Sequence, residues 1–156
     1  RSACRYTKRA TVSAGGLGGP PTFGSERFEC AESRFVHVGE TIIADQDFRP
    51  RRCLWAHPPG RGGLSIRYPA AQLGRQIVGH GGMYWITERE RRGAPVELRV
   101  DVGSRHVGTF IHADGDGWAR FEMPLGDAAG KRLPVTFTVS SPDNRHRHFC
   151  FEARSR

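Results

Sequence analysis

The sequence has no run of about 18 apolar residues, so it predicts no transmembrane helix. It also lacks the short motifs of common active sites: Gly-x-Ser-x-Gly, His-Glu-x-x-His and a phosphate-binding glycine loop do not occur. Ser13, Ser25 and Ser104 stand without the companion residues of a catalytic serine. These absences count against an enzyme of those classes and favour a non-catalytic protein.

Lysine is almost absent, since only Lys8 and Lys131 among the 24 basic residues are lysine and the others are arginine. The formal net charge is +8, but the basic side chains are dispersed along the chain. Only Glu88–Arg92, which is mixed in sign, and Arg145–His148 form clusters. Because nucleic-acid binding needs a contiguous basic patch, this dispersion favours a solvated arginine-rich surface, with an anion site as the alternative.

Cysteine pairs at zinc-site spacing are also missing. The four cysteines are widely spaced, which is typical of disulfides formed in an oxidising compartment. Of the three possible pairings we expect Cys4–Cys30 and Cys53–Cys150, and four reduced, buried cysteines are the alternative. Together with a sequence that begins at Arg1, as in a mature or excised piece, this predicts an extracellular, periplasmic or cell-envelope location.

Twenty glycines and ten prolines exclude a protein of long helices. From Cys53 onward apolar and polar residues alternate with period two, as in Leu64–Tyr68, Val96–Val102 and Val135–Val139, and turn residues separate these runs. Each run predicts a strand with one dry and one wet face, and only Pro69–Val78 has a pattern that a helical turn could use. The sequence therefore predicts an all-β, antiparallel β-sandwich.

The N-terminal part has a different composition. Ala14–Pro21 is mostly glycine and proline, which suits neither a helix nor the interior of a strand. We therefore expect an irregular, glycine-rich N-terminal extension over residues 1–39 and a β-sandwich domain over residues 40–156.

The order of segments in the second part resembles the galactose-binding-like jelly-roll superfamily, the fold of discoidin domains and many carbohydrate-binding modules. The segments that carry this resemblance correspond to an early strand, a glycine-flanked strand and turn, a central strand, a strand after a turn and a closing strand. They are Cys53–Pro58, Gly79–Thr87, Ala94–Val100, Asp116–Glu122 and Phe149–Ala153.

The resemblance implies a jelly roll in which a Cys53–Cys150 bridge joins the neighbouring first and last strands. It also implies a calcium ion near those strands, and the nearest acidic residues are Asp45, Asp47 and Glu152. Ligand sites of related modules lie on loops at one end of the sandwich. By this analogy the ligand-binding residues are expected to be His57, Arg61, His80, Trp85, Arg89 and Arg145.

Several segments allow two interpretations. An aromatic of the glycine-containing stretch His80–Trp85 suits the apolar face of a pyranose, although a core position is the alternative. Asp114–Gly117 is either a fragment of a calcium loop or a simple hairpin turn. On a strand, Glu88 and Glu90 would share one face like a glycosidase pair, but we expect a solvated charge run.

The sequence thus predicts a non-catalytic binding module for a carbohydrate or other envelope glycan, in a secreted or envelope-attached protein. No cofactor is required by this hypothesis, and nucleic acid is not the favoured partner. The alternative is a structural or protein-interaction domain of a larger extracytoplasmic protein or enzyme. An exposed aromatic of residues 80–89 in a loop cleft would favour the sugar.

Overall fold

The computed structural model describes residues 4–8, 22–30 and 35–156. Within these ranges the chain forms strands almost throughout, with one short α-helix, α1 (Trp85–Glu90), and one 3-10 turn (Gly126–Ala128). The strands are β1 (Arg5–Lys8), β2 (Thr22–Glu29), β3 (His37–Ala44), β4 (Pro50–Ala56), β5 (Leu64–Gln72), β6 (Gln76–Met83), β7 (Val96–Val102), β8 (Arg105–His112), β9 (Ala119–Pro124), β10 (Arg132–Ser140) and β11 (Phe149–Ser155).

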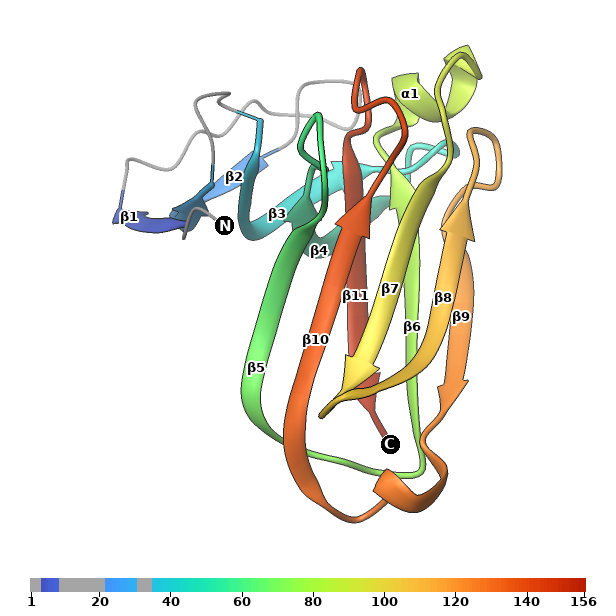
Figure 1. Ribbon diagram of the computed structural model, residues 1–156. Coiled ribbons are helices and arrows are strands. Elements are labelled where there is room, and N and C mark those ends of the chain that lie inside the picture. Colours follow the sequence, from blue (N-terminus) through green and yellow to red (C-terminus); the bar gives the residue numbers. More distant parts are fainter. Residues whose placement is uncertain (1–3, 9–21, 31–34) are drawn as a thin grey trace.

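The strands form two antiparallel sheets that pack face to face (Figure 1). The larger sheet has the order β1-β2-β3-β4-β11-β6-β9, and the smaller sheet has the order β5-β10-β7-β8. Alternation places one side of each strand in the shared core: Val96, Leu98 and Val100 of β7 are fully buried, whereas Glu97 and Arg99 between them are exposed. The predicted all-β, antiparallel sandwich is therefore confirmed.

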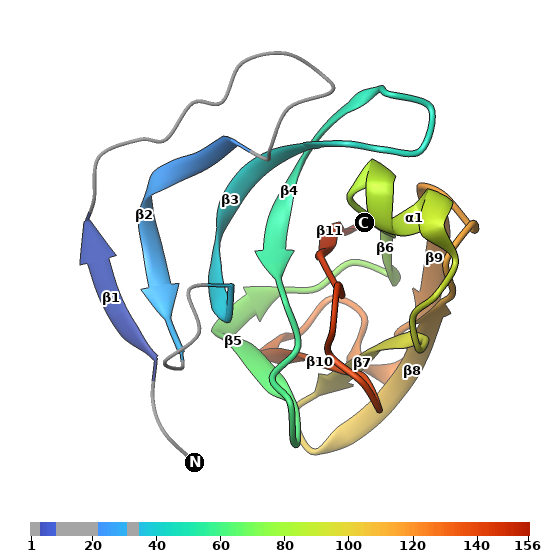
Figure 2. The same cartoon turned by 90° about the horizontal axis from the view of Figure 1, so that it is seen from above.

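The four N-terminal strands form what we call the arm, β1 to β4, which runs across the direction of the remaining strands, the body (Figure 1). Seen from above, the arm curves away from the body (Figure 2). Strand β4 pairs with β11 only through Trp55–Cys150 and Leu54–Phe151, whereas β11 pairs with β6 along its whole length from Phe149 to Ser155. The arm and the body are thus joined by a short stretch of sheet.

Two disulfides brace this arrangement, and both are the predicted pairs. Cys53–Cys150 crosses the junction between arm and body, with the two Cα atoms 5.7 Å apart. Cys4–Cys30 joins the residues that flank β1 and β2 at one end of their hairpin. Every cysteine of the chain is therefore in a disulfide, and the alternative of four reduced cysteines is wrong.

The structure corrects the expectation that residues 1–39 are irregular. Strands β1 and β2 and the start of β3 extend the larger sheet, and residue 40 falls inside β3. The glycine-rich run Ala14–Pro21 lies outside the described residues. Period-two alternation is weak in β2, whose sequence is Thr-Phe-Gly-Ser-Glu-Arg-Phe-Glu, because a strand close to the sheet edge has little of its surface in the main core.

The helical turn is also elsewhere than predicted. Pro69–Val78 contributes to β5 and β6, whereas Trp85–Glu90 forms α1, which overlaps the segment Gly79–Thr87 that the resemblance assigned to a strand and turn. Thr87 and Glu88 point into the protein, and Arg91 ends the helix in a left-handed conformation with φ of 51°. Among the described residues no helix is long and apolar enough to cross a membrane.

Candidate functional site

Loops from three parts of the body meet at the end that carries α1 (Figure 1). Their side chains enclose a polar cleft of about 450 Å³. We call it the loop-end cleft. It is formed by the segment after α1, the β8–β9 loop and the β10–β11 loop. Its lining residues are Glu90, Arg92, Gly93, Asp114, Asp143, Arg145, His146 and Arg147.

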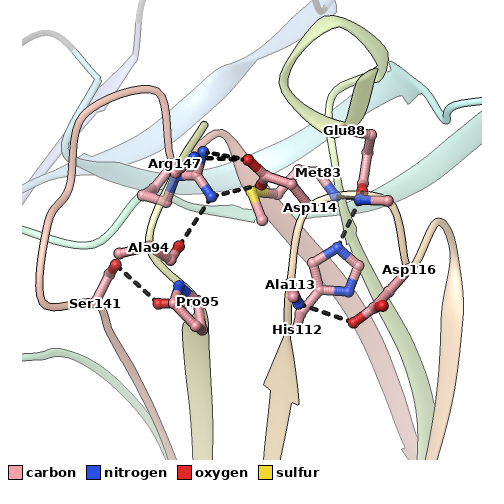
Figure 3. Close-up of polar contacts among 12 residues, drawn as sticks. Met83, Glu88, Ala94, Pro95, His112, Ala113, Asp114, Asp116, Ser141 and Arg147 are labelled. Atoms are coloured by element: carbon pink, nitrogen blue, oxygen red, sulfur yellow. Dashed lines mark hydrogen bonds and ion pairs between the residues drawn. The ribbon is translucent and has the colours of Figure 1, made fainter. Parts of the chain in front are cut away.

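The floor of the loop-end cleft contains a buried ion pair (Figure 3). The guanidinium of Arg147, 1% exposed, donates to Asp114 Oδ1 at 2.6 Å and Oδ2 at 3.1 Å, and also to the carbonyl of Ala94 at 2.9 Å. Gly93 N–H donates to the same carboxylate at 2.9 Å. A Cβ on Gly93 would lie 1.6 Å from Arg147 Nη2, so only glycine fits beside the guanidinium. Asp114 is therefore fully engaged by protein donors.

A second buried pair lies next to it (Figure 3). Glu88 Oε1 accepts a hydrogen bond from Met83 N–H at 2.8 Å and lies 2.6 Å from His112 Nε2, while Oε2 accepts from Gly115 N–H at 2.7 Å. Glu88 and His112 are at most 1% exposed. The expectation that Glu88 belongs to a solvated charge run is wrong, because the segment is a helix that turns Glu88 inward while Glu90 stays exposed.

The rim of the loop-end cleft is exposed and electrically balanced. Arg145 binds Asp143 through its guanidinium and backbone N–H, and these contacts lower the pKa of Asp143 to about 2. Across the whole cleft three aspartate or glutamate side chains face three arginines. No tryptophan, tyrosine or phenylalanine is among the described residues that line it. The cleft therefore offers neither an excess of positive charge nor an aromatic platform.

Two of the predicted ligand residues, Trp85 and Arg89, come together, but they pack on each other. The Arg89 guanidinium lies 4.4 Å from the Phe48 ring centroid and 5.9 Å from the Trp85 centroid, and it donates to the carbonyl of Gln46 at 2.7 Å. The ring centroids of Phe48 and Trp85 are 5.2 Å apart, and Trp85 is only partly exposed. The aromatic of residues 80–89 is thus packed under an arginine instead of being presented in a cleft.

The other four predicted ligand residues do not meet. Arg145 lies on the rim of the loop-end cleft, and Arg61 lies in the exposed β4–β5 loop. His80 is on β6, and His57 is buried after β4. The structure therefore brings together only Trp85 and Arg89 of the six residues and places the other four in separate surroundings.

His57 belongs to an aromatic cluster on the outer side of the larger sheet. Its ring stacks on Trp55 at 6.3 Å and lies 5.7 Å from His148, which precedes β11 in a loop, and Phe35 contacts both histidines. Burial lowers the pKa of His57 to about 4, and the repulsion that His148 would exert once both rings are protonated adds to this effect. Burial likewise lowers the pKa of His148 to about 4.

We expect the stability of the protein to fall as the pH is lowered from 6.5 towards 4. In this window the unfolded chain, whose histidines titrate near 6.5, binds more protons than the folded chain, in which His57 and His148 stay neutral. The loss is about 2 kcal/mol at pH 5 for each of the two rings that stays neutral in the folded chain. Urea unfolding between pH 7.5 and about 5, above the range of most carboxylates, measures it. A His57→Phe/His148→Phe variant should have a flatter profile; an unchanged slope would contradict this assignment.

The acidic residues expected to hold calcium do not form one site. Asp45 Oδ1 accepts from the backbone of Asp47 at 2.9 Å, and Oδ2 accepts from Arg51 Nε at 2.8 Å. Glu152 lies on β11 and pairs with His80 Nδ1 at 2.7 Å. Among the described residues no three His, Cys, Asp or Glu side chains are arranged to hold a metal ion. The carboxylates near the first and last strands are instead used in local turns and ion pairs.

A different concave surface carries the exposed aromatic residues. Where the arm diverges from the body, the two enclose a groove of about 490 Å³, which we call the arm–body groove. Tyr6 is 52% exposed, Phe28 49% and Tyr68 47%. Tyr6 and Phe28 face each other across β1 and β2 with ring centroids 5.5 Å apart. The apolar lining consists of Tyr6, Phe28, Val38 and Leu54 from the arm and Ile66 and Tyr68 from β5.

Sequence reasoning did not find this groove. Tyr6 and Phe28 lie in the part of the chain that was expected to be irregular, and Tyr68 was identified only as part of the alternating strand Leu64–Tyr68. The pairing of Tyr6 with Phe28, and of Phe28 with Val38, depends on the strand register of the arm. The one signal of the groove in the sequence was the alternation of Leu64, Ile66 and Tyr68, because it places a large aromatic residue at the end of the apolar face of a strand.

Comparisons with known proteins agree with the fold. No family model matches the chain, and no curated protein matches it. Among solved structures, the chain is similar to one described as the CBM51-2 and INT domains from Clostridium perfringens ZmpB, with a TM-score of 0.50 and 10% sequence identity. The match covers 96% of this chain and 31% of that chain. The sequence-based resemblance to carbohydrate-binding modules is therefore supported at the level of the fold.

Proposed function

We propose that this chain is a non-catalytic carbohydrate-binding module and that its ligand lies in the arm–body groove. The observation that carries the proposal is the set of three half-exposed aromatic rings, Tyr6, Phe28 and Tyr68, in one concave surface. The apolar face of a pyranose ring stacks on such side chains, and a groove excludes water from that contact. The solved neighbour of carbohydrate-binding-module type supports this choice of ligand class.

Polar side chains stand where the hydroxyl groups of a stacked sugar would need partners. Glu26, Glu40 and Arg67 line the same groove as the aromatic rings. Glu26 and Glu40 have exposed carboxylates, with Lys8 and Arg52 as their ion-pair partners. Carboxylates accept from sugar hydroxyls and guanidinium groups donate to them, so the groove combines an apolar platform with donors and acceptors at its rim.

The smaller sheet carries a row with the chemical order of a catalytic triad, but its geometry argues against catalysis. Thr109 Oγ1 lies 3.3 Å from His106 Nε2, and His106 Nδ1 lies 3.3 Å from Asp101 Oδ1. Both oxygens of Asp101 already bind the Arg99 guanidinium at 2.8–3.1 Å, and this contact lowers the pKa of Asp101. The Asp101 charge is thus neutralised, and Thr109 is an exposed residue of a sheet face. We therefore propose a binding function without catalysis.

The proposed setting is a secreted or envelope-attached protein. Two disulfides in a chain of 156 residues fit an oxidising compartment, where glycans are also exposed. The alternative function is that of a domain that docks onto a partner protein. In that case the exposed aromatic residues of the arm–body groove would contact the partner, and the chain would bind no sugar preferentially.

Replacing Tyr68 by alanine should weaken glycan binding about tenfold, because the ring at the centre of the groove is lost. A glycan array probed with the folded chain, at two salt concentrations and with and without a chelator, should identify the ligands. Titration of the best ligand then compares the variant with the wild type.

The matched control is Ile111→Ala, which removes an apolar side chain that is 59% exposed on β8, outside the groove. This control should bind like the wild type. An array without any binder at either salt concentration would refute the carbohydrate-binding function and leave the protein-docking alternative.

A further inference from the structure

The arm–body groove adjoins two further cavities, and this continuity bears on which glycan it takes. Resting on the proposed function, we infer that the ligand is a neutral, linear polysaccharide chain that lies along the whole groove, instead of a single terminal sugar. Three features carry the inference: the continuity of the groove, the balance of its charges and the blocked edge of β5.

The groove continues beyond the three aromatic rings. Two further cavities, of about 290 and 240 Å³, follow it along the body. The first shares Glu40, Leu54 and Tyr68 with the 490 Å³ cavity, and the second shares Tyr68, Phe137 and Ala153 with the first. All three therefore form one channel with Tyr68 at its centre. Such a channel can seat several consecutive rings, whereas a site for one sugar needs only one cavity.

The two walls of this channel come from different parts of the fold. Tyr6 and Phe28 stand on the arm, which is joined to the body by two residue pairs and one disulfide. Tyr68 stands on β5 of the smaller sheet, where its ring contacts Phe137 at 6.0 Å. A ligand that contacts both walls must bridge the arm and the body, and a chain of linked rings can do so with different rings.

The charges along the channel cancel. Its acidic residues are Glu26, Glu40 and Glu152, and its basic residues are Arg52, Arg67 and Arg154. Glu40 and Arg52 neutralise each other directly at 2.7 Å. Although the whole chain has a net charge of +8, the channel itself provides no excess of positive charge. Its ligand is accordingly a neutral glycan that binds through stacking and hydrogen bonds.

The channel also differs from a site for an extended peptide. A peptide would add to the free edge of β5, the outer strand of the smaller sheet. Pro69 lies in the middle of β5 and has no N–H to donate, and a register shift between Leu133 and Val135 interrupts the adjacent pairing. Proline and irregular pairing block edge-to-edge association of strands. The side chains that line the channel can still bind a glycan, because a glycan does not pair with a strand edge.

Calorimetric titration with neutral oligosaccharides tests the inference. The probes are the gluco-, xylo-, manno- and galacto-oligosaccharide series from one to six units, with a uronic-acid series beside them. We expect one neutral series to bind at least about tenfold more tightly as the hexasaccharide than as the monosaccharide, equally at low and high salt. Tyr6→Ala on the arm and Tyr68→Ala on the body should each remove most of this gain, whereas Ile111→Ala should keep it.

Different failures separate this inference from the proposed function. A monosaccharide that binds as tightly as its hexasaccharide, or a preference for the uronic-acid series that disappears at high salt, would overturn the neutral-chain inference while the chain stays a carbohydrate-binding module. Absence of binding to every neutral and acidic glycan would refute the module itself. Circular dichroism of each variant shows whether it is folded, so that a loss of the tighter hexasaccharide binding can be attributed to the removed ring. The tyrosine variants lie on separate walls, so the same loss in both is independent evidence for a ligand that contacts both walls.

Discussion

Replacing Arg147 by methionine should destabilise the protein by about 3–5 kcal/mol, because the Asp114 carboxylate would be left buried without its guanidinium partner. Arg147 is 1% and Asp114 4% exposed, so water cannot substitute for the lost charge. The guanidinium also binds the carbonyl of Ala94, which would lose a donor. Chemical denaturation of the purified variant measures the free energy of unfolding.

The neighbouring Arg145 gives a matched control. It also pairs with an aspartate, Asp143, but its side chain is 82% exposed, and Arg145→Met should leave the free energy of unfolding nearly unchanged because solvent screens this pair. The double variant Arg147→Met/Asp114→Asn should be more stable than Arg147→Met alone, since it removes the uncompensated charge. Equal stability of Arg147→Met and the wild type would show that this pair does not hold the loops together.

Removing the Cys53–Cys150 disulfide should cost about 2–5 kcal/mol. This bridge closes a long loop, with a sequence separation of 97, and it crosses the junction where β4 pairs with β11 through only two residue pairs. In the Cys53→Ala/Cys150→Ala variant the arm should detach more readily from the body, so that glycan binding in the arm–body groove is lost along with stability.

Cys4→Ser/Cys30→Ser is the comparison. That bridge has a sequence separation of 26 and joins β1 to β2 within the arm, and its loss should cost less because a shorter loop is released. Thermal unfolding of both double variants measures the difference, and mass spectrometry after alkylation should find no free thiol in the native wild type. A larger destabilisation of the Cys4→Ser/Cys30→Ser variant would contradict this prediction, because it would show that the disulfide within the arm stabilises the fold more than the disulfide at the junction.

The two-faced strands were predictable from sequence because they lie in the middle of a sheet. Val96–Val102 and Val135–Val139 alternate regularly since each has a core on one side and solvent on the other. The arm was not predictable, since Thr22–Glu29 lies near the edge of the larger sheet and has few apolar residues. The place of Phe28 in the groove follows only from its pairing with Tyr6 and Val38. The all-β fold followed from repeated local patterns, whereas the groove followed from register.

The polar sites were hidden for a different reason. Glu88 lies in a run of alternating charges that resembles a solvated segment, and only the helical turn of α1 brings it to His112, 24 positions away. Asp114 and Arg147 are 33 positions apart and meet because two loops share one end of the body. Contacts of this kind depend on how distant loops fold over one another, and no local spacing in a single sequence encodes them.

The Cys53–Cys150 bridge also determines what happens to this molecule when its backbone is cut. The β4–β5, β8–β9 and β10–β11 loops all lie between the two bridged cysteines. A single cleavage in any of these loops leaves both fragments covalently joined, and each strand beside the cut keeps its partners within its own sheet. A nicked molecule thus stays in one piece, and the walls of its groove stay tethered to each other.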